Sequence, residues 1–449
     1  MVKKYFGTDG IRGRANQGLM TTDMAMKLGA AAGSIFTRGP HRHMVIIGKD
    51  TRLSGYMLEP ALTAGFISVG MDVILVGPMP TPAVAMLTKS LRADLGIMIS
   101  ASHNPYYDNG IKIFNPDGFK LSDQIELDIE SRIDNYSDEY FAASQLLGKT
   151  KRLEDAQGRY IEYVKSTFPK RKTLAGLKIV IDCANGAAYH LGPIILWELG
   201  AEVISIGVNP NGFNINENCG SNYPQNLVQE VVKNKADLGI ALDGDSDRVI
   251  IVDEKGKVID GDQLMAAISK YHKELGTLNN SSIVATVMSN IGLERYLNSL
   301  KLHLIRSNVG DKHVMLKMQE SGANIGGEQS GHIILSDYST TGDGLIAALQ
   351  ILSVIVESQK PASEVLNLFE PFPQILKNVK FDKISPLENV NIQTLIKAKE
   401  EEIGDRGRIL VRKSGTEQLI RIMAEGDDIS FITNIVDEIV DNISNLIQS

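Results

Sequence analysis

Short runs of apolar residues alternate with longer segments of helical length in the first part of the chain. Residues 44–47, 73–76 and 95–99 have the length of strands, and residues 58–69 and 82–89 have the length of helices. This alternation is typical of βαβ units, in which a helix connects two parallel strands. The pattern therefore predicts a mostly parallel sheet with helices packed against it.

The same alternation starts again twice further along the chain. The second set of expected strands and helices lies at residues 178–181, 191–199, 202–206, 227–234 and 238–242. The third set lies at residues 282–287, 293–299, 302–307 and 313–319. Because each set repeats the order of the first, we expect three related mixed α/β domains.

The pattern changes after a Pro-Phe-Pro break at residues 371–373. Residues 408–412 and 419–424 alternate in side-chain character, and residues 429–447 have the period of an amphipathic helix. These features predict a fourth, smaller α+β domain. The expected domains are residues 1–155, 156–256, 257–370 and 371–449.

One short segment recurs in all three expected α/β domains. Ala-Asp-Leu-Gly-Ile occurs at residues 93–97 and 236–240, and a degenerate copy, Ala-Asn-Ile-Gly, occurs at residues 323–326. The first copy leads to Ser102, the second to three aspartates and the third to a loop at residues 327–332. If the copies are equivalent strand ends, their loops can face one pocket. A hydroxyl, a carboxylate triad and a polar loop together indicate phosphoryl transfer with a divalent cation.

The three aspartates form the strongest chemical pattern in the chain. Asp243, Asp245 and Asp247 are spaced two residues apart, so their charges repel unless a hard cation neutralises them, and such oxygen ligands suit Mg²⁺. An EF-hand calcium loop is the competing pattern, since Glu254 occupies its twelfth position. It is excluded because Arg248 stands where that loop needs glycine and because both flanking segments are strand-like. A solvated acidic turn is the plainer alternative.

Ser102 is the candidate carrier of the phosphoryl group. Taken alone, its Ser-His-Asn-Pro surroundings are also compatible with a simple turn. A serine hydrolase is disfavoured because no Gly-x-Ser-x-Gly elbow surrounds this residue. A phosphoryl carrier needs a cation on the phosphate oxygens and basic side chains around them. The candidates for that positive charge are Arg12, Lys112 and Arg248.

Two later loops have the composition of ligand-binding segments. In the loop at residues 327–332, Glu328 and Ser330 can accept and donate hydrogen bonds to sugar hydroxyls, whereas a structural role is the plainer interpretation for His332. The loop at residues 412–417 combines cations, hydroxyls and backbone N–H groups, which together suit a dianionic phosphate. Its candidate phosphate ligands, with one arginine beyond the loop, are Arg412, Ser414, Gly415, Thr416 and Arg421.

Composition narrows the range of partners and compartments. The 449 residues carry a net charge of -8, and the pI of about 5.6 disfavours a broad surface for nucleic acid or an anionic membrane. Only Cys183 and Cys219 occur, which suits a reducing compartment. The longest apolar segment, residues 345–356, is too short to span a bilayer and follows Asp343, a plausible N-cap, so we expect a buried helix and a cytoplasmic protein.

Five motifs in order carry a resemblance to a known family across essentially the whole chain. They lie at residues 6–13, 100–105, 243–248, 327–332 and 412–417, and the first reads Phe-Gly-Thr-Asp-Gly-Ile-Arg-Gly. In these segments the chain resembles the α-D-phosphohexomutase superfamily. The resemblance implies four domains around a central cleft, with three that share a mixed α/β core and a fourth that differs.

The resemblance also implies a role for each motif. Ser102 is then the phosphoserine, and its phosphate together with Asp243, Asp245 and Asp247 holds Mg²⁺. Glu328 and Ser330 match the sugar-contacting loop, and residues 412–416 match the phosphate-binding loop. Lys112 and His332 stand where relatives place candidate proton-transfer groups, while Arg12 and Arg248 are expected to stabilise transferring charge.

The substrate expectation also comes from the resemblance. The opening motif, the loop at residues 327–332 and the segment at residues 214–220 favour glucosamine 6-phosphate, converted to glucosamine 1-phosphate through a glucosamine 1,6-bisphosphate intermediate. Members acting on mannose or glucose phosphates are the alternative, and a non-catalytic sugar-phosphate sensor is a further one. Relatives suggest a homodimer. One departure is Gln418, where relatives usually have a proline that would stiffen the loop exit.

Overall fold

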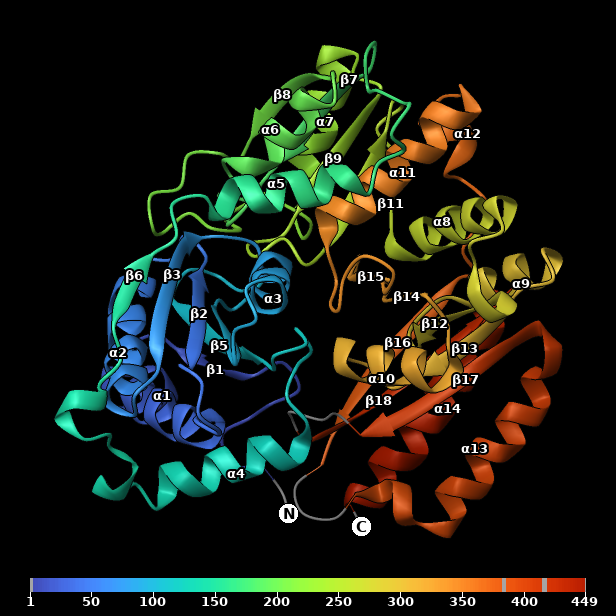
Figure 1. The fold of residues 1–449 in the computed structure, drawn as a ribbon. Coiled ribbons are helices and arrows are strands. Elements are labelled where there is room, and N and C mark those ends of the chain that lie inside the picture. The colour runs from blue at the N-terminus through green and yellow to red at the C-terminus, as the bar shows by residue number, and fades with distance from the viewer. Residues whose placement is uncertain (1–2, 382–384, 414–417, 449) are drawn as a thin grey trace. The chain divides into compact units, whose positions relative to one another are not determined.

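The computed structural model describes residues 3–381, 385–413 and 418–448 (Figure 1). The chain divides into two compact units. The first unit comprises Met1–Thr286 and Ile305–Leu368, and the second comprises Val287–Leu304 and Phe369–Ser449.

The first unit begins with a six-stranded sheet in the order β1-β5-β4-β2-β3-β6. The strands are β1 (Ile11–Arg14), β2 (Met44–Lys49), β3 (Asp72–Pro78), β4 (Leu95–Ile99), β5 (Asp108–Phe114) and β6 (Thr150–Arg152). The parallel core that the sequence predicts is present, since β2 runs parallel to β3 and β4. Strand β5 runs antiparallel to both β4 and β1, which makes the sheet mixed.

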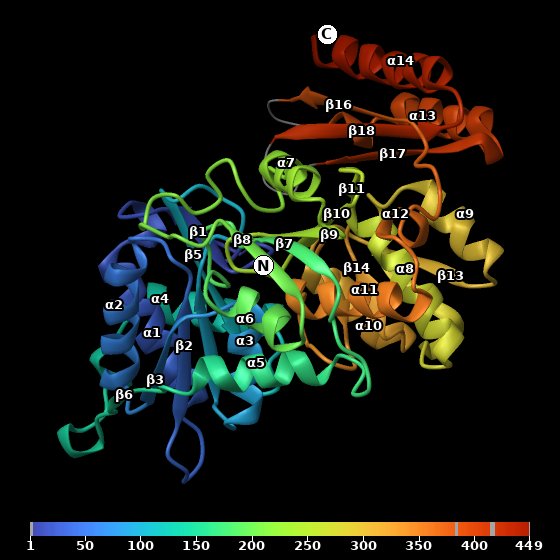
Figure 2. The ribbon, with the colours of Figure 1, turned by 90° about the horizontal axis from the view of Figure 1, so that it is seen from above.

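Helices cover both faces of this sheet. They are α1 (Thr22–Phe36), α2 (Gly55–Ser68), α3 (Thr81–Ser90) and α4 (Asp123–Asp134). Figures 1 and 2 show α1 and α2 on one face and α3 on the other. Since both faces are covered, β4 is buried along its whole length, which explains its unbroken apolar sequence.

The second sheet of the first unit repeats this arrangement in the order β11-β10-β9-β7-β8. Its strands are β7 (Lys178–Asp182), β8 (Glu202–Ile206), β9 (Leu238–Leu242), β10 (Val249–Asp253) and β11 (Val258–Ile259). The helices of this region are α5 (Ala156–Ser166), α6 (Leu191–Glu198) and α7 (Gln225–Asn234). Strand β9 lies between parallel β7 and antiparallel β10, as β4 lies between β2 and β5.

The third sheet has four strands in the order β13-β12-β14-β15. They are β12 (Ser282–Thr286), β13 (His303–Ser307), β14 (Ile325–Gly327) and β15 (Ile333–Leu335). Strand β14 is parallel to β12 and antiparallel to β15, so the strand that begins within each repeated segment occupies the same position in its sheet. The helices are α8 (Gly261–Leu275), α10 (Asp311–Ser321), α11 (Gly344–Ser358) and α12 (Ala362–Val365).

Helix α11 confirms the expectation for the longest apolar segment. Asp343 is its N-cap and accepts hydrogen bonds from the N–H groups of Leu345 and Ile346, each at 3.0 Å. The helix is buried over most of its length. Across the described part of the chain, every helix is too short or too polar to cross a bilayer.

The second unit contains a three-stranded antiparallel sheet in the order β16-β18-β17. Its strands are β16 (Gln374–Lys380), β17 (Gly407–Lys413) and β18 (Leu419–Gly426), and its helices are α9 (Ile291–Ser299), α13 (Val390–Ile403) and α14 (Ile429–Gln448). Apolar residues of the sheet, α13 and α14 form one buried core. This is the α+β architecture expected for the C-terminal region.

Candidate active site

Ser102 lies in the loop that follows β4 and is 1% exposed. Its backbone is left-handed, with φ of 53°, an uncommon conformation for a non-glycine residue that marks a constrained position. The hydroxyl Oγ donates to Asp243 Oδ2 at 2.5 Å and lies 3.3 Å from Nδ1 of His103. The structure thus joins the ends of β4 and β9, as the repeat predicts.

A set of buried polar groups holds the Ser102 backbone. Its N–H donates to Ser100 Oγ, which in turn donates to Asp50 Oδ2. Its carbonyl accepts from the guanidinium of Arg52 at 2.8 Å and from the amide of Asn216 at 2.9 Å. Arg52 is 1% exposed and also pairs with Asp50 at 2.8 Å. The hydroxyl is therefore presented from a rigid platform.

The three aspartates of the acidic loop converge just beyond β9. Asp243, Asp245 and Asp247 are buried, and a carboxylate oxygen from each lies within 4.8 Å of the other two. Gly244 allows this approach, because a Cβ at that position would stand 2.7 Å from the carbonyl oxygen of Ser102. The strands β9 and β10 flank the loop, which agrees with the exclusion of an EF-hand.

The triad has the properties of a cation site. Burial raises the pKa of Asp243 well above its ordinary value, and the charges of Asp247 and Asp245 raise it further. Within the described residues, Asp245 Oδ1 is buried and has no hydrogen-bond donor. Closely spaced carboxylates with an unsatisfied oxygen fit a hard divalent cation.

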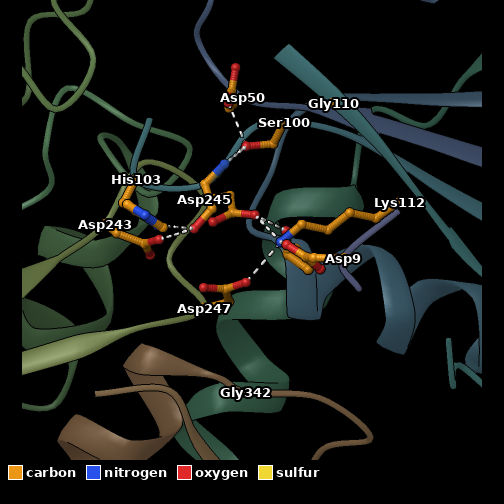
Figure 3. Close-up of polar contacts among 12 residues, drawn as sticks. Asp9, Asp50, Ser100, His103, Gly110, Lys112, Asp243, Asp245, Asp247 and Gly342 are labelled. Atoms are coloured by element: carbon orange, nitrogen blue, oxygen red, sulfur yellow. Dashed lines mark hydrogen bonds and ion pairs between the residues drawn. The ribbon is translucent and has the colours of Figure 1, made fainter. Parts of the chain in front are cut away.

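Lys112 reaches the triad from β5 and is 1% exposed (Figure 3). Its Nζ donates to Asp245 Oδ2 and Asp247 Oδ2, both at 2.8 Å, and lies 3.4 Å from Asp9. Burial by itself would lower the pKa of Lys112, but these three carboxylates raise it well above its ordinary value. Lys112 is therefore protonated and supplies positive charge.

Asp9 links the N-terminal motif to this charged cluster. It forms ion pairs with Arg12 and Lys120 in addition to Lys112. Burial would raise the pKa of Asp9, yet these three cations hold it well below its ordinary value. Lys120 also pairs with Asp311, which extends the cluster toward the third sheet.

His332 lies in the hairpin between β14 and β15 and is buried. Its Nδ1 is 3.5 Å from Asp247 Oδ1, and its Nε2 accepts from the N–H of Gly342 at 3.1 Å. A Cβ on Gly342 would stand 2.4 Å from that nitrogen, so only glycine permits this contact. Because Nε2 is an acceptor here, the ring proton lies on Nδ1, toward Asp247. His332 thus contacts the triad rather than only packing in the core.

The remaining residues of this hairpin and Arg248 complete the site in the first unit. The side chain of Glu328 accepts from the N–H of Gly310 at 3.0 Å, and the hydroxyl of Ser330 lies 3.5 Å from it. Arg248 lies 4.0 Å from Asp247. Burial would lower the pKa of Arg248, but Asp247, Asp243 and Glu328 raise it. The hairpin is therefore electrostatically coupled to the triad through Arg248.

The expected phosphate-binding residues lie in the second unit. Arg412 on β17 and Arg421 on β18 are direct cross-strand partners. Burial, and next the charge of Arg421, lower the pKa of Arg412. Two adjacent arginines of this kind attract an anion. Ser414, Gly415 and Thr416 lie outside the described residues, while Gln418 is described and accepts a hydrogen bond from the N–H of Phe381 through its backbone carbonyl.

Sequence reasoning did not single out several residues of this cluster. Asp9 and Asn216 lie within segments that carry the family resemblance but have no predicted role in the site, and the sequence patterns do not mark Asp50 or Arg52. His103 was noted as a turn residue, but its ring lies beside Ser102; burial, together with Arg248 and Arg12, lowers the pKa of His103 to about 4. The position of His103 directly after Ser102 in the sequence could have indicated that it belongs to the site.

Comparison with known families accounts for nearly the whole chain. The α/β/α domains I, II and III of phosphoglucomutase/phosphomannomutase match residues 3–140, 158–256 and 260–372, and the C-terminal domain of that family matches residues 372–442.

Relatives and solved structures agree with that result. Phosphoglucosamine mutase of Parvibaculum lavamentivorans is 63% identical over 439 residues and 98% of each chain, and that of Methylorubrum populi is 60% identical over 443 residues and 99% of each chain. The structure of a phosphoglucomutase/phosphomannomutase family protein from Burkholderia thailandensis has a TM-score of 0.81 at 25% identity, over 97% of both chains. An Aspergillus fumigatus N-acetylphosphoglucosamine mutase, in complex with GlcNAc-6P and magnesium, shares the fold with a TM-score of 0.67 at 17% identity, over 98% of this chain and 95% of its own.

Proposed function

The chain belongs to the phosphoglucomutase/phosphomannomutase family of the α-D-phosphohexomutase superfamily, and from this we propose that it interconverts glucosamine 6-phosphate and glucosamine 1-phosphate. It is thus an isomerase that moves a phosphoryl group within a hexosamine phosphate. The product is a precursor for UDP-N-acetylglucosamine synthesis.

The proposed reaction uses phosphorylated Ser102 as the donor. The bond from phosphorus to Ser102 Oγ breaks as a bond from phosphorus to sugar O1 forms, the proton of the O1 hydroxyl leaves, and Ser102 Oγ regains a proton. Glucosamine 1,6-bisphosphate results and turns end for end. Its 6-phosphate then moves to Ser102 by the same exchange at O6, which leaves glucosamine 1-phosphate and restores the phosphoserine.

The residues of the first unit supply position and charge for this transfer. Asp243, Asp245 and Asp247, together with the phosphate on Ser102, would hold Mg²⁺, which adds positive charge at the transferring phosphoryl oxygens. Lys112, with its proton held by three carboxylates, adds further charge there without a proton transfer of its own. Arg12 and Arg248 contribute in the same way.

The remaining predicted residues would bind the parts of the substrate that do not react. Glu328 and Ser330 would contact sugar hydroxyls, and His332 would orient Asp247. Arg412 and Arg421 would bind the distal phosphate with Ser414, Gly415 and Thr416. The arginine pair supports this role, since the two guanidinium groups repel one another and an anion between them would relieve the repulsion. The four domain boundaries and a homodimer are parts of this proposal that size-exclusion chromatography and limited proteolysis can test.

One observation carries the mechanism: Ser102 Oγ and Asp243 Oδ2 meet at 2.5 Å, with Lys112 bound to the other two aspartates. A nucleophilic hydroxyl at a triad that fits a cation is the arrangement that metal-assisted phosphoryl transfer needs. The choice of glucosamine as the sugar has other support, namely relatives of about 60% identity over the full chain.

A coupled assay tests the proposal. Glucosamine 6-phosphate, glucose 6-phosphate and mannose 6-phosphate are compared in parallel, with Mg²⁺ and a trace of the matching bisphosphate. We expect marked preference for the amino sugar. Preference for a neutral sugar would overturn the substrate while leaving the phosphoserine mechanism intact. No turnover of any of the three, despite phosphate detected on Ser102 by mass spectrometry, would instead favour a sensor.

A further inference from the structure

Two histidines and an aspartate meet at the edge of the first sheet opposite Ser102. His41 and His43 precede β2, and Asp94 precedes β4. His41 Nε2 lies 2.8 Å from Asp94 Oδ1, and His43 Nδ1 lies 3.4 Å from the same oxygen. The imidazole rings are 4.2 Å apart between centroids and inclined at 63°. A single carboxylate oxygen thus faces two ring nitrogens.

Arg42, between the two histidines, does not contact Asp94. Its guanidinium turns to Asp72, with contacts of 2.9 and 2.6 Å, and donates to the carbonyl of Leu147. The guanidinium of Arg42 is therefore paired with Asp72, while both histidines contact Asp94.

Asp94 is held in place independently of the histidines. Its Oδ2 accepts from the N–H of Met44 at 2.8 Å, and its own N–H donates to the Met44 carbonyl at 2.8 Å. The second repeat contains the same anchor, because Asp237 accepts from the N–H of Lys178 at 2.7 Å and donates back to its carbonyl. A shared structural role therefore explains the aspartates of both repeats.

That shared role does not explain the histidines. When Met44 is aligned with Lys178, the positions of His43 and His41 correspond to Leu177 and Ala175 in the second repeat. The second repeat forms its anchor without any imidazole. The two histidines are thus an addition specific to the first repeat, and they are placed on the one oxygen of Asp94 that the anchor leaves available.

We propose that His41, His43 and Asp94 form a binding site for a zinc-class transition-metal dication, separate from the aspartate triad. One ligand atom from each of the three residues lies within 4.8 Å of the other two, a span that small side-chain rotations close around one ion. Two imidazoles and a carboxylate favour Zn²⁺, Co²⁺ or Ni²⁺ over Mg²⁺, which prefers oxygen ligands alone. Since the side chain of His41 is 58% exposed, water can complete the coordination.

The site would act on the stability of the first sheet rather than on the chemistry. Asp94 and Ser102 lie at opposite ends of β4, whose five residues span roughly 17 Å. A bound ion would connect the segment before β2 to the segment before β4. Because an ion that binds only the folded chain stabilises it, we expect Zn²⁺ to raise the thermal midpoint.

Zinc titration of the full-length protein by calorimetry tests the site. Excess Mg²⁺ is present so that the triad is occupied. The test protein is the double variant that carries both His41→Gln and His43→Gln. The control is His190→Gln, which replaces an exposed histidine. We expect one equivalent of Zn²⁺ in the wild type and the control, and a loss of affinity of at least ~10-fold in the double variant. Equal binding by the double variant, or equal weakening in the control, would show adventitious surface binding only and overturn the proposal.

A matched pair of aspartate variants provides a second readout that does not depend on histidine packing. Asp94→Asn keeps an oxygen acceptor for Met44, as Asp237→Asn does for Lys178, so both variants should fold. Only Asp94→Asn is expected to abolish the rise in thermal midpoint with Zn²⁺ and to weaken the visible absorption of bound Co²⁺. If the two variants respond alike, the carboxylate of Asp94 is not a ligand and the proposal fails. Because neither readout involves turnover, this outcome is independent of the proposed mutase reaction.

Discussion

The ends of β4 and β9 are equivalent in sequence and topology but opposite in chemistry. Both strands begin at the leucine of an Ala-Asp-Leu-Gly-Ile segment, and both lie between a parallel and an antiparallel neighbour. The loop after β4 carries the candidate reacting hydroxyl of Ser102, whose backbone is held by neutral and paired groups. The loop after β9 carries three buried carboxylates, which need positive charge from elsewhere.

The difference shows how one repeated unit can serve two purposes. In the first loop the fold fixes the position of the reacting atom, whereas in the second it concentrates negative charge that Lys112, Arg248 and a bound cation can balance. Lys112 comes from β5, the antiparallel neighbour of β4, so the first repeat also supplies part of the compensation. The two loops are thus dependent on one another, and removing either chemistry should have distinct consequences.

Removing the hydroxyl should have the largest effect. Ser102→Ala deletes the only atom that can carry the phosphoryl group in the proposed reaction, so turnover should fall by ~10⁴-fold or more. Ser246→Ala is the matched control, because Ser246 also has a left-handed backbone and lies in the loop after β9. It should retain phosphate at Ser102 and most of its activity. Turnover in Ser102→Ala comparable to the control would refute the mechanism.

Weakening the charge of the second loop should have the next largest effect. Asp245→Asn removes one carboxylate charge while preserving the shape of the side chain. Loss of a residue that only orients a metal ligand already lowers metal affinity by about 10–100-fold. For Asp245→Asn we therefore expect an affinity for Mg²⁺ at least ~100-fold lower, with a parallel drop in turnover. Asp237→Asn, directly before β9 and at the end of that strand opposite to the triad, should leave the Mg²⁺ titration unchanged. Identical titrations for both variants would remove the triad from the metal site.

Disturbing the platform under Ser102 should have a smaller effect that falls on the rate. Arg52→Lys retains a charge beside Asp50 but cannot reproduce the contacts of the guanidinium with the carbonyls of Ser102 and Asn104. A shift of the hydroxyl by about 1 Å would lower kcat by up to ~100-fold with little change in KM. Arg159→Lys, on an exposed helix face, is the control. A change in KM alone would mean that Arg52 serves substrate binding instead.

The repeated strands could be predicted from the sequence, but the contacts of Lys112 with the aspartates could not. The Ala-Asp-Leu-Gly-Ile copies and their apolar strands are local patterns, which is why the parallel core and the meeting of Ser102 with Asp243 could be predicted. Strands β1 and β5 were not predicted, although they carry Arg12 and Lys112. Their register, with Arg12 opposite Gly110, joins segments almost a hundred residues apart, and such pairing leaves no periodic trace in one chain. The bonds from Lys112 to two aspartates could not be foreseen for the same reason.

A comparison of Asp343 with Asp247 shows how Lys112 and His332 change the pKa of a buried carboxylate. Burial would raise the pKa of Asp247, but Lys112 and His332 hold it well below its ordinary value, whereas burial raises the pKa of Asp343 from 3.8 to about 6. Asp343 accepts only from Tyr160 and two backbone N–H groups among the described residues. Between pH 4 and 6 the folded chain binds more protons at Asp343 than the unfolded chain does.

The folding free energy should therefore depend on pH through Asp343. Its contribution is fully present below pH 3.8 and is lost as the pH rises through about 6, by about 3 kcal/mol for a shift of this size. Asp343→Asn keeps the helix cap and cannot ionise, so the variant should gain stability relative to the wild type across this range and keep a constant advantage above it. Urea denaturation from pH 4 to 8, with Asp237→Asn as the exposed control, measures the difference. A difference in stability that does not vary with pH would mean that burial alone does not raise the pKa of a carboxylate in this fold. The low pKa of Asp247 would then not show that Lys112 and His332 overcome an effect of burial.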